Sequence, residues 1–180
     1  MVGNCITQWA SVENALFDIC LACLGCSRER AAIVYYRTPT VESRLQLADE
    51  LVRSVLPMRE PPSGGHDHPD LVFWDRAAKK LRDILHTRNQ LAHHPIASRF
   101  EVDLSGPGHP KSYSWFEVYV GQNEKLRERS ANLQPLLIED LRAHLILTTG
   151  VKDTLERFRD EKLSAHVQAS AAQNPQPIPR

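Results

Sequence analysis

The sequence predicts a mainly α-helical fold, a bundle of four to five helices with a β-hairpin insertion. Two observations lead to this prediction. Apolar residues recur at helical spacing through most of the chain, as they do in amphipathic helices. One stretch, at about residues 97–120, instead alternates apolar and polar residues around a Gly-Pro-Gly-His-Pro connection, which is typical of two paired strands. We therefore expect the helices to form the core and the hairpin to be inserted between two of them.

The first half of the chain predicts three helices, over residues 7–24, 28–36 and 41–55. Gly25 suits the end of the first helix, because glycine readily adopts the left-handed conformation found there. Pro39 ends the second helix, since the residue before a proline avoids helical geometry. Thr38 or Thr40 can cap the third helix, which ends before Pro57.

The second half predicts two longer helices, over residues 69–94 and 135–163, on either side of the hairpin. Pro69 suits a first helical turn, and Pro95 restricts the residue before it. From residue 164 onward the chain is rich in Ala, Gln, Ser and Pro and poor in large apolar residues. This composition predicts a disordered tail over 164–180 and a single folded domain over 1–163.

Charge and composition narrow the range of functions. The 22 basic and 22 acidic side chains cancel, which disfavours a protein that coats nucleic acid through a broad basic surface. A local RNA-binding patch remains compatible with this balance. The longest apolar run near the N-terminus, Ile19–Leu24, is far too short to cross a bilayer, and no signal-peptide pattern precedes it. We therefore expect a cytoplasmic protein that does not contact membranes.

The four cysteines lie close together near the N-terminus rather than spread along the chain as in a disulfide scaffold. Cys20, Cys23 and Cys26 have a spacing that resembles metal ligands. However, Cys20 and Cys23 fall on the apolar face of the predicted first helix, where cysteine behaves as a small hydrophobic residue. We expect reduced thiols, no bound metal and no cofactor.

The most informative segment is Arg88-Asn89-Gln90-Leu91-Ala92-His93, near the end of the predicted 69–94 helix. Arg88 falls on the apolar face, where its permanent charge requires a carboxylate, a phosphate or a water-filled cleft. Asn89 and His93 lie on the adjoining polar face. A guanidinium can hold two phosphate oxygens, and an imidazole can take the 2′-hydroxyl proton of RNA or protonate the leaving oxygen. Asn89 could hydrogen-bond the phosphate or fix the imidazole, so the segment fits phosphodiester cleavage.

Structural interpretations of the same residues remain open. Arg88 can be a core arginine paired with Glu13, which the first helix places within its own apolar arc. His93 can face the negative end of the helix dipole. His86 shares the face of His93 two turns away and is either an accessory residue of a cleft or an ordinary surface residue.

The segment from Arg88 to His93 resembles the motif of HEPN domains, an arginine followed after a few residues by a histidine, often with a polar residue directly after the arginine. The resemblance implies a helical bundle that dimerises, with two motifs facing each other across the dimer cleft. It also implies a metal-independent endoribonuclease that acts as a toxin or defence component, with an antitoxin as a partner. By this resemblance Arg88, Asn89 and His93 are catalytic, while Glu13 and His86 are accessory residues.

The chain departs from the minimal core of that family in its predicted hairpin, which follows the motif directly. Other members are non-catalytic modules. The alternative prediction is therefore a helical module that binds a nucleotide or a partner protein without cleaving it. The balanced net charge favours this alternative.

Overall fold

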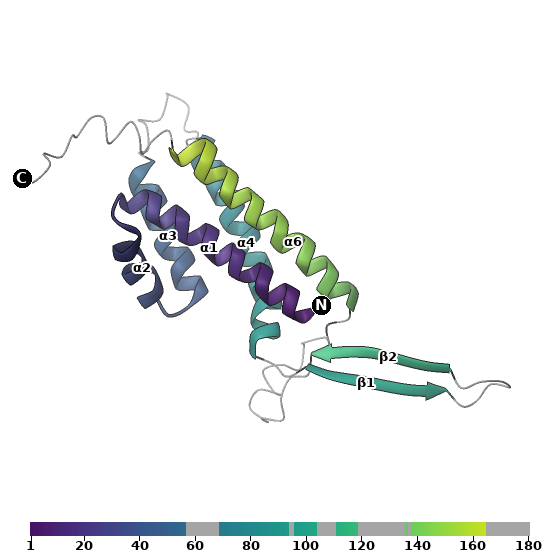
Figure 1. The fold of residues 1–180 in the computed structure, drawn as a ribbon. Coiled ribbons are helices and arrows are strands. Elements are labelled where there is room, and N and C mark those ends of the chain that lie inside the picture. Colours follow the sequence, from purple (N-terminus) through teal and green to yellow (C-terminus); the bar gives the residue numbers. More distant parts are fainter. Residues whose placement is uncertain (57–68, 94–95, 104–110, 119–135, 137, 165–180) are drawn as a thin grey trace, which may run out of the picture. The chain divides into compact units, whose positions relative to one another are not determined.

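The computed structural model shows two compact units, each assembled from segments that lie far apart in the sequence (Figure 1). Unit 1 comprises residues 1–9 and 84–148, and unit 2 comprises residues 10–83 and 149–180. The structure describes residues 1–56, 69–93, 96–103, 111–118, 136 and 138–164, without the side chains of His93 and of the two strands. Residues 165–180 of the predicted tail lie outside this part of the chain.

The first three helices are α1 (Val2–Leu24), α2 (Arg28–Arg37) and α3 (Val41–Val55). Their predicted ends are confirmed closely. Gly25 follows α1 with a φ of 58°, the left-handed conformation that glycine adopts without steric cost. Thr40 caps α3, because its hydroxyl accepts a hydrogen bond of 3.1 Å from the backbone N–H of Ser43. Only the start of α1 differs substantially, at Val2 rather than residue 7.

The remaining helices are α4 (Pro69–His93) and α6 (Ile138–Arg157), and α6 continues directly into a π-helix, η1 (Phe158–Leu163). The predicted 69–94 helix is confirmed, with Pro69 in its first turn. The last helix begins at Ile138 rather than at residue 135. Over the described residues, none of the helices has both the length and the apolar character of a membrane span.

The predicted fold class requires a correction. Among the residues described with their side chains, 92% lie in five helices and none lies in a strand, so the fold is all-α. A β-hairpin insertion at 97–120 is therefore not part of the fold class. The backbone of β1 (Ile96–Asp103) and β2 (Lys111–Val118) forms a two-stranded antiparallel ladder, in which Ile96 lies opposite Val118. A ladder of only two strands is marginally stable by itself and does not define a fold, which the helices do here.

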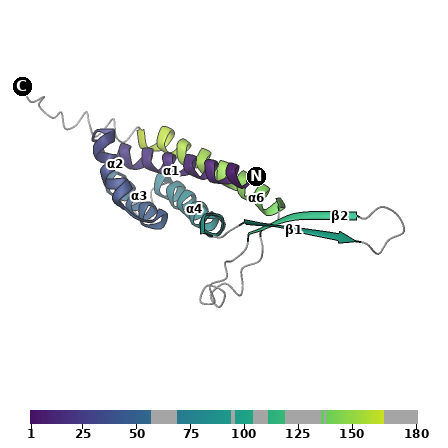
Figure 2. The same ribbon diagram turned by 60° about the horizontal axis from the view of Figure 1, so that its bottom comes forward.

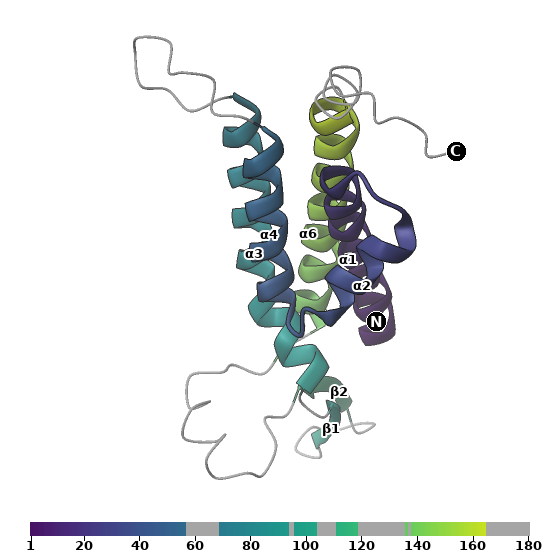
Figure 3. The same cartoon turned by 90° about the vertical axis from the view of Figure 1, so that its left-hand side faces the viewer.

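Unit 2 is organised around buried aromatic rings that connect its helices. Within this unit, α2 lies against α1, and α3 lies beside the first half of α4 (Figures 2 and 3). Phe17 on α1 and Tyr35 on α2 meet edge to face, with ring centroids 5.4 Å apart. Trp74 on α4 packs on Phe158 of η1, with centroids 5.2 Å apart. The Trp74 indole N–H also donates a 2.8 Å hydrogen bond to Asp49 of α3, which fixes the ring in place.

In unit 1, one cluster of buried residues joins three helices, each of which contributes one residue. Cys5 comes from α1, Leu91 from α4 and Leu141 from α6. The Cys5 thiol donates a 3.6 Å hydrogen bond to the backbone carbonyl of Leu141. Three partly buried residues pack against this cluster, namely Val2, Leu136 and Leu145. The first turn of α1 is thus held by long-range contacts within unit 1.

Candidate functional site

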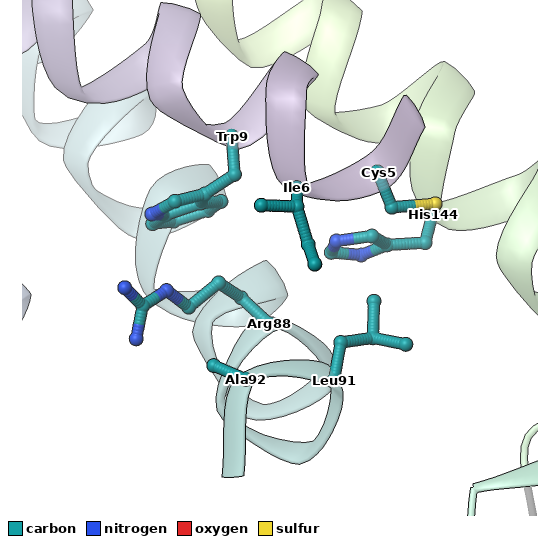
Figure 4. A pocket seen from close by; sticks show the side chains of 7 residues that line it. All are labelled: Cys5, Ile6, Trp9, Arg88, Leu91, Ala92 and His144. Atoms are coloured by element: carbon teal, nitrogen blue, oxygen red, sulfur yellow. The ribbon is translucent and has the colours of Figure 1, made fainter. Parts of the chain in front are cut away.

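Unit 1 contains a cavity of about 240 Å³ between the starts and ends of three helices. Its lining residues are Cys5, Ile6 and Trp9 of α1, Arg88, Leu91 and Ala92 of α4, and His144 of α6 (Figure 4). Most of these side chains are apolar. The guanidinium of Arg88 and the imidazole of His144 add strong hydrogen-bonding groups, and they lie on opposite sides of the cavity (Figure 4). A few polar groups on an apolar wall are the usual composition of a small-ligand site.

Arg88 is half-buried, and its neighbours hold the guanidinium in a defined position. The guanidinium carbon lies 5.6 Å from the centre of the Trp9 ring, a cation–π contact that Figure 4 shows from the side. One terminal nitrogen, Nη1, donates a 3.2 Å hydrogen bond to the side-chain oxygen of Asn89. The sequence places Arg88 on the inner face of α4, and the fold gives that face a cavity. Its position satisfies the expectation that a charge on this face requires a cleft or a partner.

His144 is buried on the other side of the cavity, with only 4% of its surface exposed. Burial lowers its pKa below the ordinary value of 6.5, because the charged imidazolium is poorly solvated there. Thr148, one turn further along α6, lies with its hydroxyl oxygen 3.4 Å from the imidazole Nε2. The same hydroxyl donates a 2.7 Å hydrogen bond to the backbone carbonyl of His144. Near neutral pH the ring is therefore uncharged and carries one donor and one acceptor.

The inner part of the cavity is mostly apolar. Leu91 is buried beside His144, and Cys5 contributes a buried thiol. Burial raises the pKa of this thiol, so it remains protonated and acts as a packing group rather than a nucleophile. Ile6 and Ala92 are exposed and form part of the rim. The cavity is thus open at one side and apolar within.

The predicted site residues are only partly brought together. Arg88 lines the cavity, and Asn89 is exposed beside it and hydrogen-bonded to it. His86 is exposed on α4 and is not among the lining residues. His93 is the last residue of α4, and its side chain lies outside the described residues. Its predicted role therefore stays a prediction.

Glu13 belongs to unit 2, where its carboxylate binds a different arginine. Arg44 Nη1 donates to Glu13 Oε2 over 3.0 Å, and both side chains are largely buried. The predicted pair of Glu13 with Arg88 would join the two units, and it stays a prediction. The guanidinium carbon of Arg44 also lies over the ring of Tyr35, 5.3 Å from its centre. Glu13 therefore has a structural role in unit 2, because it binds the arginine that packs on this ring.

Two residues that line the cavity, Trp9 and His144, were not among the site residues predicted from the sequence. A histidine on an otherwise apolar stripe is the one local signal that could have identified His144. Its position opposite Arg88 depends on long-range packing, which helical periodicity does not encode.

The described residues contain no group of three or more His, Cys, Asp or Glu side chains arranged to hold a metal ion, and Cys5, Cys20, Cys23 and Cys26 are all free thiols. Burial raises the pKa of Cys20 and of Cys23 to about 12, so both remain protonated near neutral pH. The cavity of unit 1 is the candidate site that we consider in the described part of the chain. No protein-family model, no curated protein and no solved structure matches this sequence.

Proposed function

We propose that the protein is a metal-independent endoribonuclease of the HEPN type, acting in the cytoplasm as a toxin or defence component. The observation that carries this proposal is the position of Arg88, whose side chain lines a cavity and whose guanidinium is held at its edge by Trp9 and Asn89. A fixed guanidinium is suited to bind the phosphate of RNA and to stabilise the charge that develops during its cleavage. The segment from Arg88 to His93 supports the proposal through its resemblance to the HEPN motif.

In the proposed reaction, one histidine takes the proton of a ribose 2′-hydroxyl. The 2′-oxygen then bonds to phosphorus, and the bond from phosphorus to the 5′-oxygen breaks. A general acid gives a proton to the departing 5′-oxygen, and the products are a cyclic phosphate and a free 5′-hydroxyl. We assign the proton transfers to His93, the phosphate contacts to Arg88 and Asn89, and accessory roles to His86 and Glu13.

The test of catalysis compares variants in buffer with EDTA. We expect Arg88→Ala and His93→Ala each to reduce RNA cleavage by at least about 100-fold, because each removes a group used in the transition state. Arg142→Ala is the matched control, since Arg142 is exposed on α6 in unit 1 and does not line the cavity. Undiminished cleavage by His93→Ala would exclude its role as acid or base.

We also propose that the active form is a homodimer, with an antitoxin as a partner of each subunit. A single helix projects Arg88 and His93 in directions about 140° apart, so two chains related by a twofold axis would complete a site more readily than one. We expect light scattering to give the mass of a dimer. We also expect a mixture of Arg88→Ala and His93→Ala chains to recover part of the activity that each variant lacks. A monomer at micromolar concentration would contradict the composite site.

A second candidate function is a non-catalytic module that binds a nucleotide or a partner protein. The mostly apolar lining of the cavity and the balanced charge of the chain favour this candidate. Binding of RNA or a nucleotide without any cleavage in the experiment above would decide in its favour.

A further inference from the structure

We infer that the cavity between Arg88 and His144 holds the base of one unpaired nucleotide, whose phosphate binds Arg88 and whose exocyclic amino group donates to His144. The choice of a nucleotide rests on the proposed function. The inference adds a substrate preference, for amino-bearing bases such as adenine, and assigns that preference to His144.

The size of the cavity limits what can enter it. At about 240 Å³ it is smaller than the roughly 300–1,000 Å³ of sites for drug-sized molecules, so it fits a single ring system rather than a longer chain. Its walls include the side chains of Ile6, Leu91 and the flat indole of Trp9 (Figure 4). An unstacked base presents two apolar faces and a polar edge, which match such walls.

The two polar groups of the cavity are arranged as a nucleotide requires. Arg88 lies on the side of Trp9, and its side chain is half-buried rather than enclosed, so we place the phosphate against its guanidinium. His144 lies on the other side, next to Leu91 and Cys5 (Figure 4). A base that enters from the rim therefore directs its polar edge toward His144 while its phosphate stays near the guanidinium.

The hydrogen bonds of Thr148 indicate which imidazole nitrogen of His144 carries the proton. Thr148 donates its only hydroxyl proton to the backbone carbonyl of His144, over 2.7 Å. Its oxygen is then placed to accept from the imidazole Nε2, which lies 3.4 Å away, and we assign the proton of the neutral ring to Nε2 on this ground. The other nitrogen, Nδ1, is left as an acceptor. An acceptor at this position favours bases with an amino group over bases that present a carbonyl oxygen there.

The test measures binding of two nucleotides to the full chain by titration calorimetry. The probes are adenosine 5′-monophosphate and purine riboside 5′-monophosphate, which differ only in the exocyclic amino group. We expect the adenosine compound to bind roughly 3–10-fold more tightly, the effect of one added hydrogen bond. In His144→Leu this preference should disappear. In Arg88→Ala both probes should weaken by about 10-fold or more, whereas Arg142→Ala should bind as the unchanged protein does.

A further arm of the test identifies the source of the nucleotide. A short oligodeoxyadenylate cannot be cleaved through a 2′-hydroxyl, so its binding is measured without turnover. If it binds with a dependence on His144 while the free nucleotide does not, the pocket serves a base within a strand. The inference is overturned if neither the nucleotides nor the oligodeoxyadenylate bind, or if His144→Leu keeps the preference for the amino-bearing base.

Because His144 is buried, its replacement could disturb folding, and a second variant avoids this difficulty. Ala92→Leu adds bulk at the exposed rim and leaves His144 in place, so we expect it to weaken both probes by about 10-fold through narrowing the entrance. Ala143→Leu, the same substitution at an exposed position of α6 outside the lining, is its control. Equal binding by Ala92→Leu and Ala143→Leu would exclude the cavity as the site.

The failure of this inference is distinguishable from failure of the proposed function. Binding that depends on His144 without RNA cleavage would refute the ribonuclease and retain the pocket. Cleavage in EDTA with an unchanged base preference in His144→Leu would retain the ribonuclease and refute the pocket.

Discussion

The two units use their charged and polar side chains in different ways. In unit 2, Arg44 binds Glu13, and Arg53 of α3 binds both Asp49 on its own helix and Asp75 on α4. Burial alone would raise the pKa of Asp49, but hydrogen bonds from Arg53 and Trp74 lower it below its ordinary value. These contacts tie neighbouring helices together, so the charges of this unit have a structural explanation.

In unit 1, the corresponding groups border a cavity. Arg88 lies over the indole ring of Trp9, and His144 is buried at the wall of the cavity. Function is therefore best sought at the cavity of unit 1 rather than among the ion pairs of unit 2. Arg88 and His144 line a cavity that a ligand can enter, whereas the ion pairs of unit 2 are made between its own helices.

The largest difference that we expect between the units is in the free energy of unfolding. Phe158→Ala should lower it by about 3–5 kcal/mol, because the ring is fully buried against Phe73 and Trp74. Ile6→Ala, at the rim of the cavity, should lower it by less than about 1 kcal/mol, since Ile6 is 55% exposed. Urea denaturation of both variants measures this difference. Equal losses would mean that unit 1 depends on its rim as strongly as unit 2 depends on its core.

An intermediate effect concerns the carboxylate of Glu13. Glu13→Gln should lower the free energy of unfolding by about 1–3 kcal/mol, because it removes the charge that binds the largely buried guanidinium of Arg44. A double-mutant cycle with Arg44→Met should show coupling between the two positions. The same cycle with Arg88→Met tests the predicted Glu13–Arg88 pair. Stronger coupling to Arg88 than to Arg44 would assign Glu13 to the site and weaken the contrast between the units.

The smallest expected effect is on the pH dependence of stability. Because burial lowers the pKa of His144 in the folded chain, the unfolded chain takes up its proton at a higher pH. Stability should therefore decline as the pH falls through the ordinary histidine value of 6.5 toward the lower pKa of the folded state. Thermal unfolding of the unchanged protein, of His144→Leu and of the exposed control His86→Leu measures this effect. The decline should be smaller only in His144→Leu, and an identical decline in all three would show that other groups cause it.

Much of the fold could be predicted because its signals are local. Gly25 and Thr40 mark helix ends through their own backbone and side-chain preferences, which require no knowledge of the rest of the chain. Helical periodicity also identified the inner face that carries Arg88. The start of α1 was predicted too late, because its first turn is held by the packing of Val2 and Cys5 on residues of α4 and α6. Such contacts join residues that are distant in sequence, and periodicity cannot reveal them.

The candidate site was predicted less completely for the same reason. Arg88 was identified because a charge on an apolar face is anomalous in any helix. Trp9 and His144 are ordinary in their own helices and become informative only once α1, α4 and α6 surround one cavity. The fold-class prediction was wrong for a different reason. A local alternation of apolar and polar residues at 97–120 was interpreted as an element of the fold, which is all-α.

The interleaving of the two units has a consequence for the order in which the chain can fold during synthesis. Unit 1 takes its first nine residues from the start of the chain and its last ones from the first half of α6. Cys5 therefore leaves the ribosome long before Leu141, its buried partner. At about 5–20 residues per second, the wait is on the order of ten seconds. During that interval the first turn of α1 cannot complete its packing, and a nascent chain stalled before α6 would contain neither unit in finished form.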